Sequence, residues 1–212
     1  MIAFVGDVHG KYEAVYDIMS KLSGVEYWIQ IGDFGGEDLL YPDKLLNFCF
    51  IQGNHENWDE LERRRKEDDF YFAPNGTVIE LKTGVIPKGL CIGIFGGNYS
   101  SRFIDKKRSE LQGGRRRHFV QEDYDALIKY KGKIDILVTH EAPDPYPRGG
   151  QKIITDLIDI LKPKIHFFGH HHHYGVYEYC GVPSIGLDYG HRSVVLYDPE
   201  DHKIKKVDID GD

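Results

Sequence analysis

Short apolar runs that each end at a polar residue or a glycine recur through the first two thirds of the chain. Their length and composition predict buried β-strands, which we expect at residues 2–6, 27–31, 48–52, 134–138 and 165–168. Apolar residues repeat at helical spacing within residues 11–22 and 153–161, which lie between these strands. Strands that alternate with helices in this way indicate an α/β protein.

The pattern changes after His173. Short β-type runs separated by turn residues follow at residues 176–180, 183–187, 193–197 and 203–209. This ending predicts a second, largely antiparallel sheet that packs on the first. Residues 60–69 carry mixed charges that suit a solvated helix face, and residues 98–119 predict a long surface loop. No linker composition divides the chain, so we expect one domain over residues 1–212.

Composition narrows the class of protein. The chain has 212 residues, of which 41% are hydrophobic, and its formal net charge of −7 argues against a protein that coats nucleic acid through a general basic surface. The N-terminus enters an apolar strand directly, and no apolar run is long enough to span a bilayer, so we expect a soluble, cytoplasmic protein with no membrane partner. Cys49, Cys91 and Cys180 lie in apolar stretches without a Cys-x-x-Cys spacing, which favours buried, reduced thiols.

Residues that can bind a metal ion stand beside glycines or at the ends of the predicted strands. They occur in five fragments, Asp7-Val8-His9-Gly10, Gly32-Asp33, Gly53-Asn54-His55-Glu56, Thr139-His140 and Gly169-His170-His171-His172. Ligands of α/β proteins bind outside the carboxyl ends of strands, so the fragments predict one site at the rim of the sheet. The simplest interpretation is a centre of two metal ions that hydrolyses phosphate esters.

The residue types define which metals suit this site. Asp7 and His9 are one residue apart and can reach one ion, while the two oxygens of Asp33 can each bind a different ion and so bridge the pair. The other candidate ligands are Asn54, His140, His170 and His172. This set of oxygen and imidazole ligands suits two divalent or trivalent ions of manganese, iron, zinc, nickel or cobalt.

In this order the fragments resemble the motifs of the calcineurin-like metallophosphoesterases, and the resemblance extends from Asp7 to His172. It implies an α/β fold in which two packed mixed β-sheets are flanked by helices, as an α-β-β-α sandwich. It also implies two sets of metal ligands, Asp7, His9, Asp33 and His172 for one ion, and Asp33, Asn54, His140 and His170 for the other.

The resemblance assigns catalytic roles as well. Asp33 would act as the bridge between the metals, and His55 would stabilise the transition state or protonate the leaving oxygen without binding a metal. Only His170 and His172 match the family's Gly-His-x-His spacing. We therefore expect His171 and His173 to lie beside the ligands or to be exposed.

The sequence also offers clues to the substrate. The segments Asn54-His55-Glu56, 93–97 and 115–119 are similar to the catalytic part of RNA lariat-debranching enzymes, although Asp7 stands where those enzymes usually carry Cys. Guanidinium groups pair with phosphate oxygens and aromatic rings stack on bases. The candidate substrate-binding residues are Tyr99, Arg115, Arg117 and His118. We therefore expect a phosphodiesterase whose substrate is a nucleotide or nucleic acid.

Two alternatives remain open. A phosphomonoesterase acting on metabolites or phosphoproteins would share every metal ligand, although residues 32–36 lack the Asp-Arg-Gly continuation typical of protein serine/threonine phosphatases. A non-catalytic scaffold that binds a protein partner is the second alternative. It is disfavoured because a scaffold has no need to retain all seven ligands together with His55.

Overall fold

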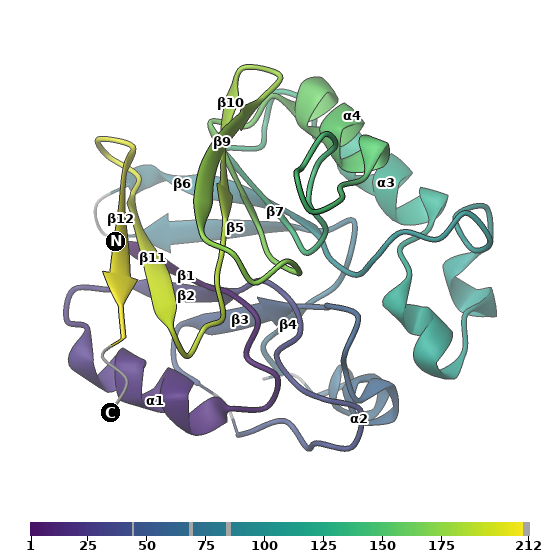
Figure 1. The fold of residues 1–212 in the computed structure, drawn as a ribbon, viewed down its shortest axis with the longest axis horizontal. Coiled ribbons are helices and arrows are strands. Elements are labelled where there is room, and N and C mark those ends of the chain that lie inside the picture. Colours follow the sequence, from purple (N-terminus) through teal and green to yellow (C-terminus); the bar gives the residue numbers. More distant parts are fainter. Residues whose placement is uncertain (44, 68–69, 84–85, 210–212) are drawn as a thin grey trace.

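Two mixed β-sheets packed face to face form the centre of the protein (Figure 1). The computed structural model describes residues 1–43, 45–67, 70–83 and 86–209. Within these ranges, the first sheet has the order β12 (Lys203–Asp208), β11 (Ser193–Asp198), β1 (Ile2–Val5), β2 (Tyr27–Gln30), β3 (Phe48–Ile51) and β4 (Phe72–Ala73). The second has the order β5 (Val78–Thr83), β6 (Ile86–Phe95), β7 (Ile136–Thr139), β8 (Ile165–Phe168), β10 (Val182–Gly186) and β9 (Gly175–Tyr179).

Helices cover the outer face of each sheet (Figure 1). The helices are α1 (Tyr12–Lys21), α2 (Trp58–Arg64), α3 (Gln121–Ile128) and α4 (Lys152–Leu161), with the 3₁₀ helices η1 (Arg108–Glu110) and η2 (Gly113–Arg117). Val15 and Ile18 of α1 pack on the first sheet, and Leu157 and Ile158 of α4 pack on the second. The layers therefore run helix, sheet, sheet, helix, as the resemblance implied.

Strand β1 illustrates why the central strands read as continuous apolar runs. Its side chains alternate between the two faces of the sheet, so Ala3 and Val5 lie against α1 while Ile2 and Phe4 point toward the other sheet. Between the sheets, the ring of Phe4 stacks on Phe167 with the centroids 3.7 Å apart. Both faces of the strand are buried, and this explains the absence of a polar alternation.

The expected alternation of strands and helices is confirmed for β1, α1, β2, β3, β7, α4 and β8. The prediction that the C-terminal strands form a separate antiparallel sheet is wrong. Strand β10 pairs in parallel with β8, and β11 pairs antiparallel with β1, so these strands extend both sheets. The reason is visible in β11, where Val195 and Tyr197 enter the core between the sheets while Val194 and Leu196 face the opposite side. A strand buried on both faces requires an interior position.

Strands β4, β5 and β6 and helix α3 are not among the predicted elements. Pro87, Gly89 and Gly93 interrupt the apolar run of β6, and this conceals a strand of ten residues. The segment 98–119, expected to be a surface loop, contains the short helices η1 and η2. The expected charged helix at residues 60–69 corresponds to α2, while residues 68–69 lie outside the described residues.

Two expectations from composition can be compared with the structure. Within the described ranges, no helix combines the length and the hydrophobicity needed to cross a lipid bilayer. All three cysteines are free thiols. Cys49 is buried and Cys91 is partly buried, but Cys180 is exposed in the turn after β9, so the prediction of buried thiols is wrong for Cys180. A tight turn between β9 and β10 explains this exposure.

Candidate metal centre

The carboxyl ends of five strands bring the predicted ligands together. Strands β1, β2 and β3 run parallel in the first sheet, and β7 and β8 run parallel in the second. Each predicted ligand lies in the segment that follows one of these strands. The two sheets pack on each other, so their carboxyl edges form a common rim where all five segments meet.

The first group of ligand atoms comes from Asp7, His9 and His172, whose ligand atoms lie within 4.8 Å of one another. Asp7 Oδ2 is 2.8 Å from His172 Nε2 and 3.9 Å from His9 Nε2, and the two ring nitrogens are 3.3 Å apart. Asp7 is fully buried, yet its Oδ2 atom accepts no hydrogen bond among the described residues. A buried carboxylate oxygen that faces two imidazole nitrogens is an arrangement that suits a cation.

The second group comes from Asp33, His140 and His170, again with ligand atoms within 4.8 Å of one another. His140 Nε2 lies 3.0 Å from Asn54 Oδ1 and 3.6 Å from Asp33 Oδ1. On the other side of its ring, His140 Nδ1 lies 3.0 Å from the carbonyl oxygen of Ile31. If Nδ1 carries the proton and donates a hydrogen bond to this carbonyl oxygen, Nε2 is left with a lone pair that points into the site.

Asp33 stands between the two groups. Its Oδ2 atom is 3.8 Å from His9 Nε2, whereas its Oδ1 atom faces His140. Oδ1 also accepts hydrogen bonds from the backbone N–H groups of Asn54, at 2.6 Å, and of His55, at 2.7 Å. The carboxylate is therefore fixed in an orientation that presents one oxygen to each group.

The backbone around the site adopts conformations that residues other than glycine rarely take. His9, Asp33, His170 and His172 have positive φ angles, of 50°, 54°, 67° and 49°. Such residues are uncommon outside glycine, and they cluster at functional sites where the surrounding structure holds them. Gly53 explains one close approach, since a Cβ atom there would overlap the Asp33 carboxylate.

Burial and charge set the protonation of the histidines in the metal-free protein. Burial, aided by His140 and His171, lowers the pKa of His170 to about 4. Burial also lowers the pKa of His9, against the opposing effect of the Asp33 and Asp7 carboxylates. Both rings are consequently neutral at pH 7, which is the form that binds metals. Burial would lower the pKa of His140 as well, but Asp33 and Asp7 outweigh it and raise that pKa.

Glu56, which has no role predicted from the sequence, joins the loops after β2 and β3. Its buried carboxylate accepts hydrogen bonds from the N–H groups of Phe34, Gly35 and Gly53, at 3.1–3.2 Å, and from the hydroxyl of Tyr41, at 2.6 Å. These donors come from the segments that carry Asp33 and Asn54. Burial, followed by the Asp33 charge, raises the pKa of Glu56 to about 7.

Two further residues beside the ligands were missed. Tyr189 stacks on His172 with the ring centroids 4.0 Å apart, and nothing in its sequence position indicated this contact. Glu141 is buried and follows His140 directly, a position that could have marked it. Its carboxylate, with His170 and His171, forms a third group of ligand atoms within 4.8 Å of one another. His171 belongs to this third group, so its expected place outside the ligand set stays a prediction, while His173 is exposed.

The structure separates the residues expected to bind substrate. Tyr99 is 37% exposed, and its N–H donates to Glu141 Oε1 at 3.2 Å, so it lies near the second group. Arg117 lines a hollow together with Glu56, whose neighbour is His55. Arg115 and His118 instead gather around Phe103. No hydrogen bond, ion pair or ring contact within the described part of the chain joins Arg115 or His118 to a metal-ligand candidate. Their role in binding substrate stays a prediction.

His55, the expected acid, lies at the mouth of the site. Its side chain is exposed, and its ring centroid is 5.7 Å from that of His9. It belongs to none of the three groups that could hold a metal among the described residues. This position leaves its imidazole available to a bound ester.

A sequence model described as calcineurin-like phosphoesterase matches residues 1–174, which include every candidate ligand. The chain belongs to the calcineurin-like phosphoesterase family. Membership implies divalent metal ions, and the donors at the rim fit such ions because they are carboxylate and amide oxygens and imidazole nitrogens. The buried Oδ2 atom of Asp7, which faces the ring nitrogens of His9 and His172, supports the same fit.

Individual proteins are similar to this chain in sequence or in fold. An uncharacterized protein of Haemophilus influenzae is 28% identical over 190 residues, covering 81% of this chain and 83% of that protein. Among solved structures, TT1561 of Thermus thermophilus superposes with a TM-score of 0.71 at 12% identity, covering 98% of this chain and 97% of that one. The phosphopantetheinyl hydrolase of Mycobacterium tuberculosis gives a TM-score of 0.53 at 15% identity and 89% coverage of each chain. At these identities the structural similarity concerns the fold.

The position of Asp33 between the two groups generates a prediction about metal binding. Asp33→Asn should weaken both metal sites, by about 10- to 100-fold or more, because one charge is shared by both. Asp7→Asn is the matched control and should weaken one site, since Asp7 belongs to the first group alone. Equilibrium dialysis with manganese, followed by measurement of bound metal per chain, separates the two results. Loss of a single ion in Asp33→Asn would contradict bridging.

The hydrogen bonds of Glu56 predict a large effect on stability. Glu56→Gln should lower the free energy of unfolding by roughly 2–4 kcal/mol, because the amide replaces one of two oxygens that accept from buried donors. Glu178→Gln makes the same change at an exposed position and should alter stability by less than about 0.5 kcal/mol. Urea unfolding of the metal-free proteins measures both. Equal stability of the two variants would mean that Glu56 does not hold the loops.

Proposed function

We propose that this protein is a metal-dependent phosphodiesterase that acts on a nucleotide-containing substrate through two metal ions. The observation that carries this proposal is the pair of ligand groups that meet on either side of Asp33. Two bound divalent ions would polarise the phosphate ester and lower the pKa of a bound water, which is the chemistry such pairs supply. The residues of the chain bind and orient the reactants around them.

Each residue has a distinct task in this proposal. One ion would be held by Asp7, His9, Asp33 and His172, and the other by Asp33, Asn54, His140 and His170. The amide N–H groups of Asn54 and His55 hold the Asp33 carboxylate in place before substrate arrives. Glu56 maintains the relative position of the loops that carry Asp33 and Asn54. Little rearrangement is then needed when the ester binds.

His55 would act on the leaving group. Its ring is exposed beside the first group and is not needed as a ligand, so a protonated ring nitrogen can donate to the departing oxygen. The same N–H would stabilise negative charge as it develops on that oxygen.

A charge argument favours a diester over a monoester. The hollow lined by Glu56, which follows His55 in the chain, has a volume of about 290 Å³ and is also lined by Glu37, Asp38 and Asp59, with Arg117 on its wall. A phosphate diester carries one negative charge, whereas a monoester carries about 1.5 to 2 at pH 7. Repulsion from the acidic side chains therefore penalises the monoester more. The hollow also provides room for a second ester group.

The proposal is tested by comparing two chromogenic esters. Chelator-stripped protein, supplemented in turn with manganese, zinc, nickel and magnesium, should hydrolyse bis-p-nitrophenyl phosphate with a higher kcat/KM than p-nitrophenyl phosphate. Preference for the monoester would instead indicate a phosphatase. Absence of turnover while metals are demonstrably bound would indicate a non-catalytic scaffold.

The role of His55 gives a second prediction. His55→Ala should retain both metals and lower kcat by roughly 10²–10⁴-fold, the range typical of lost general acid catalysis. His173→Ala removes an exposed histidine in the segment after β8 and should leave kcat unchanged. Bound metal and turnover are measured on the same samples. If His55→Ala lost a metal ion, the separation between ligand and acid would be wrong.

A further inference from the structure

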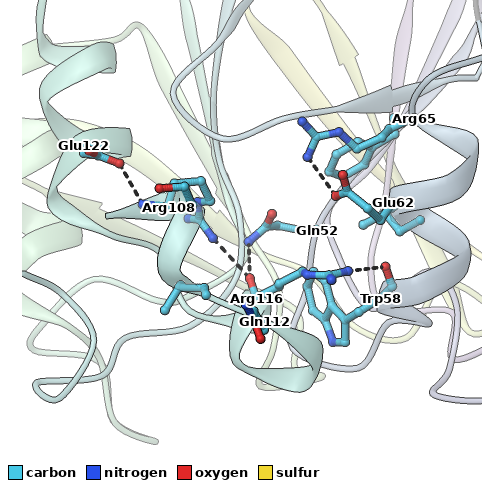
Figure 2. Close-up of a pocket in the computed structure, with 12 residues that line it drawn as sticks. Gln52, Trp58, Glu62, Arg65, Arg108, Gln112, Arg116 and Glu122 are labelled. Carbon is cyan, nitrogen blue, oxygen red and sulfur yellow. Dashed lines mark hydrogen bonds and ion pairs between the residues drawn. The ribbon is translucent and has the colours of Figure 1, made fainter. Parts of the chain in front are cut away.

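A second, larger cavity lies between α2 and the loop that carries η1 and η2 (Figure 2). Its volume is about 570 Å³, which is within the range of small-molecule sites. We call it the Trp58 pocket. The residues that line it are Gln52, Trp58, Leu61, Glu62, Arg65, Phe72, Arg108, Ser109, Leu111, Gln112, Arg116 and Glu122. None of the candidate metal ligands is among them, so the pocket is distinct from the rim.

The walls of the Trp58 pocket combine aromatic and aliphatic surface. Trp58 contributes an indole ring, and Leu61, Phe72 and Leu111 add apolar surface. Trp58, Leu61 and Leu111 are nearly buried, so their positions are fixed by packing. A rigid indole beside open volume offers a surface on which a flat ring can stack.

Polar groups are placed at defined points among these apolar walls. Gln52 is 6% exposed, and its Nε2 donates to the carbonyl oxygen of Arg116 at 3.3 Å. Arg116 in turn donates from Nη1 to the carbonyl oxygen of Trp58 at 2.9 Å. Figure 2 shows these two bonds joining both sides of the pocket. Gln52 Oε1 accepts no hydrogen bond from any described residue, so it remains an acceptor for a ligand.

The basic side chains of the pocket differ in how many hydrogen bonds and ion pairs they already make within the protein. Arg108 forms an ion pair with Asp123 and donates to two backbone carbonyls. Arg65 pairs with Glu62. Arg116 makes only the bond to Trp58 and a longer ion pair of 3.7 Å with Asp59, within the residues described. The guanidinium of Arg116 therefore retains donors for a ligand.

The pocket and the metal rim share one segment of chain. Residues 52 and 58 line the pocket, while Asn54 and His55, between them, lie at the rim. Four residues span at most about 14 Å, which limits the separation of Asn54 and Trp58. The smaller hollow lined by Glu56, which follows His55 in the chain, is also lined by Trp58.

We propose that the Trp58 pocket binds the base of a nucleotide whose phosphodiester lies at the metal centre. The proposal rests on the proposed function and assigns part of its substrate specificity. The indole of Trp58 stacks on the base, the Gln52 amide bonds to a polar edge of the base, and Arg116 contacts the sugar or a further phosphate. Stacking tolerates every base, so we expect a preference for nucleotides and only a modest preference among bases.

Fluorescence tests base binding without catalysis. The chain has two tryptophans, and Trp28 is buried in the core and does not line the pocket. In Trp28→Phe protein loaded with magnesium, adenosine 5′-monophosphate should quench the emission of Trp58 saturably. Ribose 5-phosphate has the same phosphate without a base and should not. Equal effects of the two ligands would overturn the proposal.

Kinetics test whether the pocket serves the reaction. The p-nitrophenyl ester of thymidine 5′-monophosphate should be hydrolysed with a higher kcat/KM than p-nitrophenyl methyl phosphate. Trp58→Leu should reduce this ratio by about 5- to 150-fold, the effect of one lost stacking interaction. Gln52→Met leaves the indole intact and should reduce the ratio less, and Gln121→Met, on the exposed start of α3, should not change it.

The two experiments distinguish failure of the pocket from failure of the proposed function. If both esters are hydrolysed and neither pocket variant changes their ratio, the phosphodiesterase stands and the base site is wrong. If adenosine 5′-monophosphate quenches Trp58 but no diester is hydrolysed with metals bound, the base site stands and the proposed reaction is wrong.

Discussion

The carboxylate of Asp33 is the interaction on which the geometry of the site depends. Its side chain accepts from the amides of Asn54 and His55, and its backbone carbonyl accepts from the amides of Val8, at 2.9 Å, and His9, at 2.8 Å. Asp33, in the loop after β2, therefore fixes the loops after β1 and β3. Because parallel strands end at the same edge, a single short carboxylate can reach both neighbours. The positive φ of Asp33 is the backbone conformation that this double role imposes.

The candidate ligands at the rim bring buried carboxylates and imidazoles close together, and this affects their pKa values. Asp7 and Asp33 are buried, and burial alone raises the free energy of a carboxylate. His172 and His140 oppose the effect of burial on Asp7, so that its pKa falls below its usual range. In the metal-free protein the raised pKa of His140 indicates that protonation of this ring supplies some of the missing positive charge. The rim is thus built for cations, and the protein alone compensates the buried charge only in part.

The fold and the grouping of the candidate ligands at one rim could be predicted from sequence because each signal is local. A continuous apolar run followed by Asp, Asn or His predicts both a buried strand and a candidate metal ligand at its end. Glu56 could not be assigned in this way, since its role requires three segments to converge on one carboxylate. The pairing of β11 with β1 also joins residues far apart in sequence. Its uninterrupted apolar run is nevertheless a signal for an interior strand.

The ligand set explains how a phosphate ester could be held, but it cannot by itself distinguish one ester from another. Selectivity must come from surfaces that the rest of the substrate reaches. The segment from Gln52 to Trp58 connects the two requirements, because its middle lies at the rim and its ends line the Trp58 pocket. A base bound against Trp58 would bear on the same short loop that positions Asn54 and His55. Binding energy from the base can then hold the phosphate where the chemistry occurs, rather than only increase affinity.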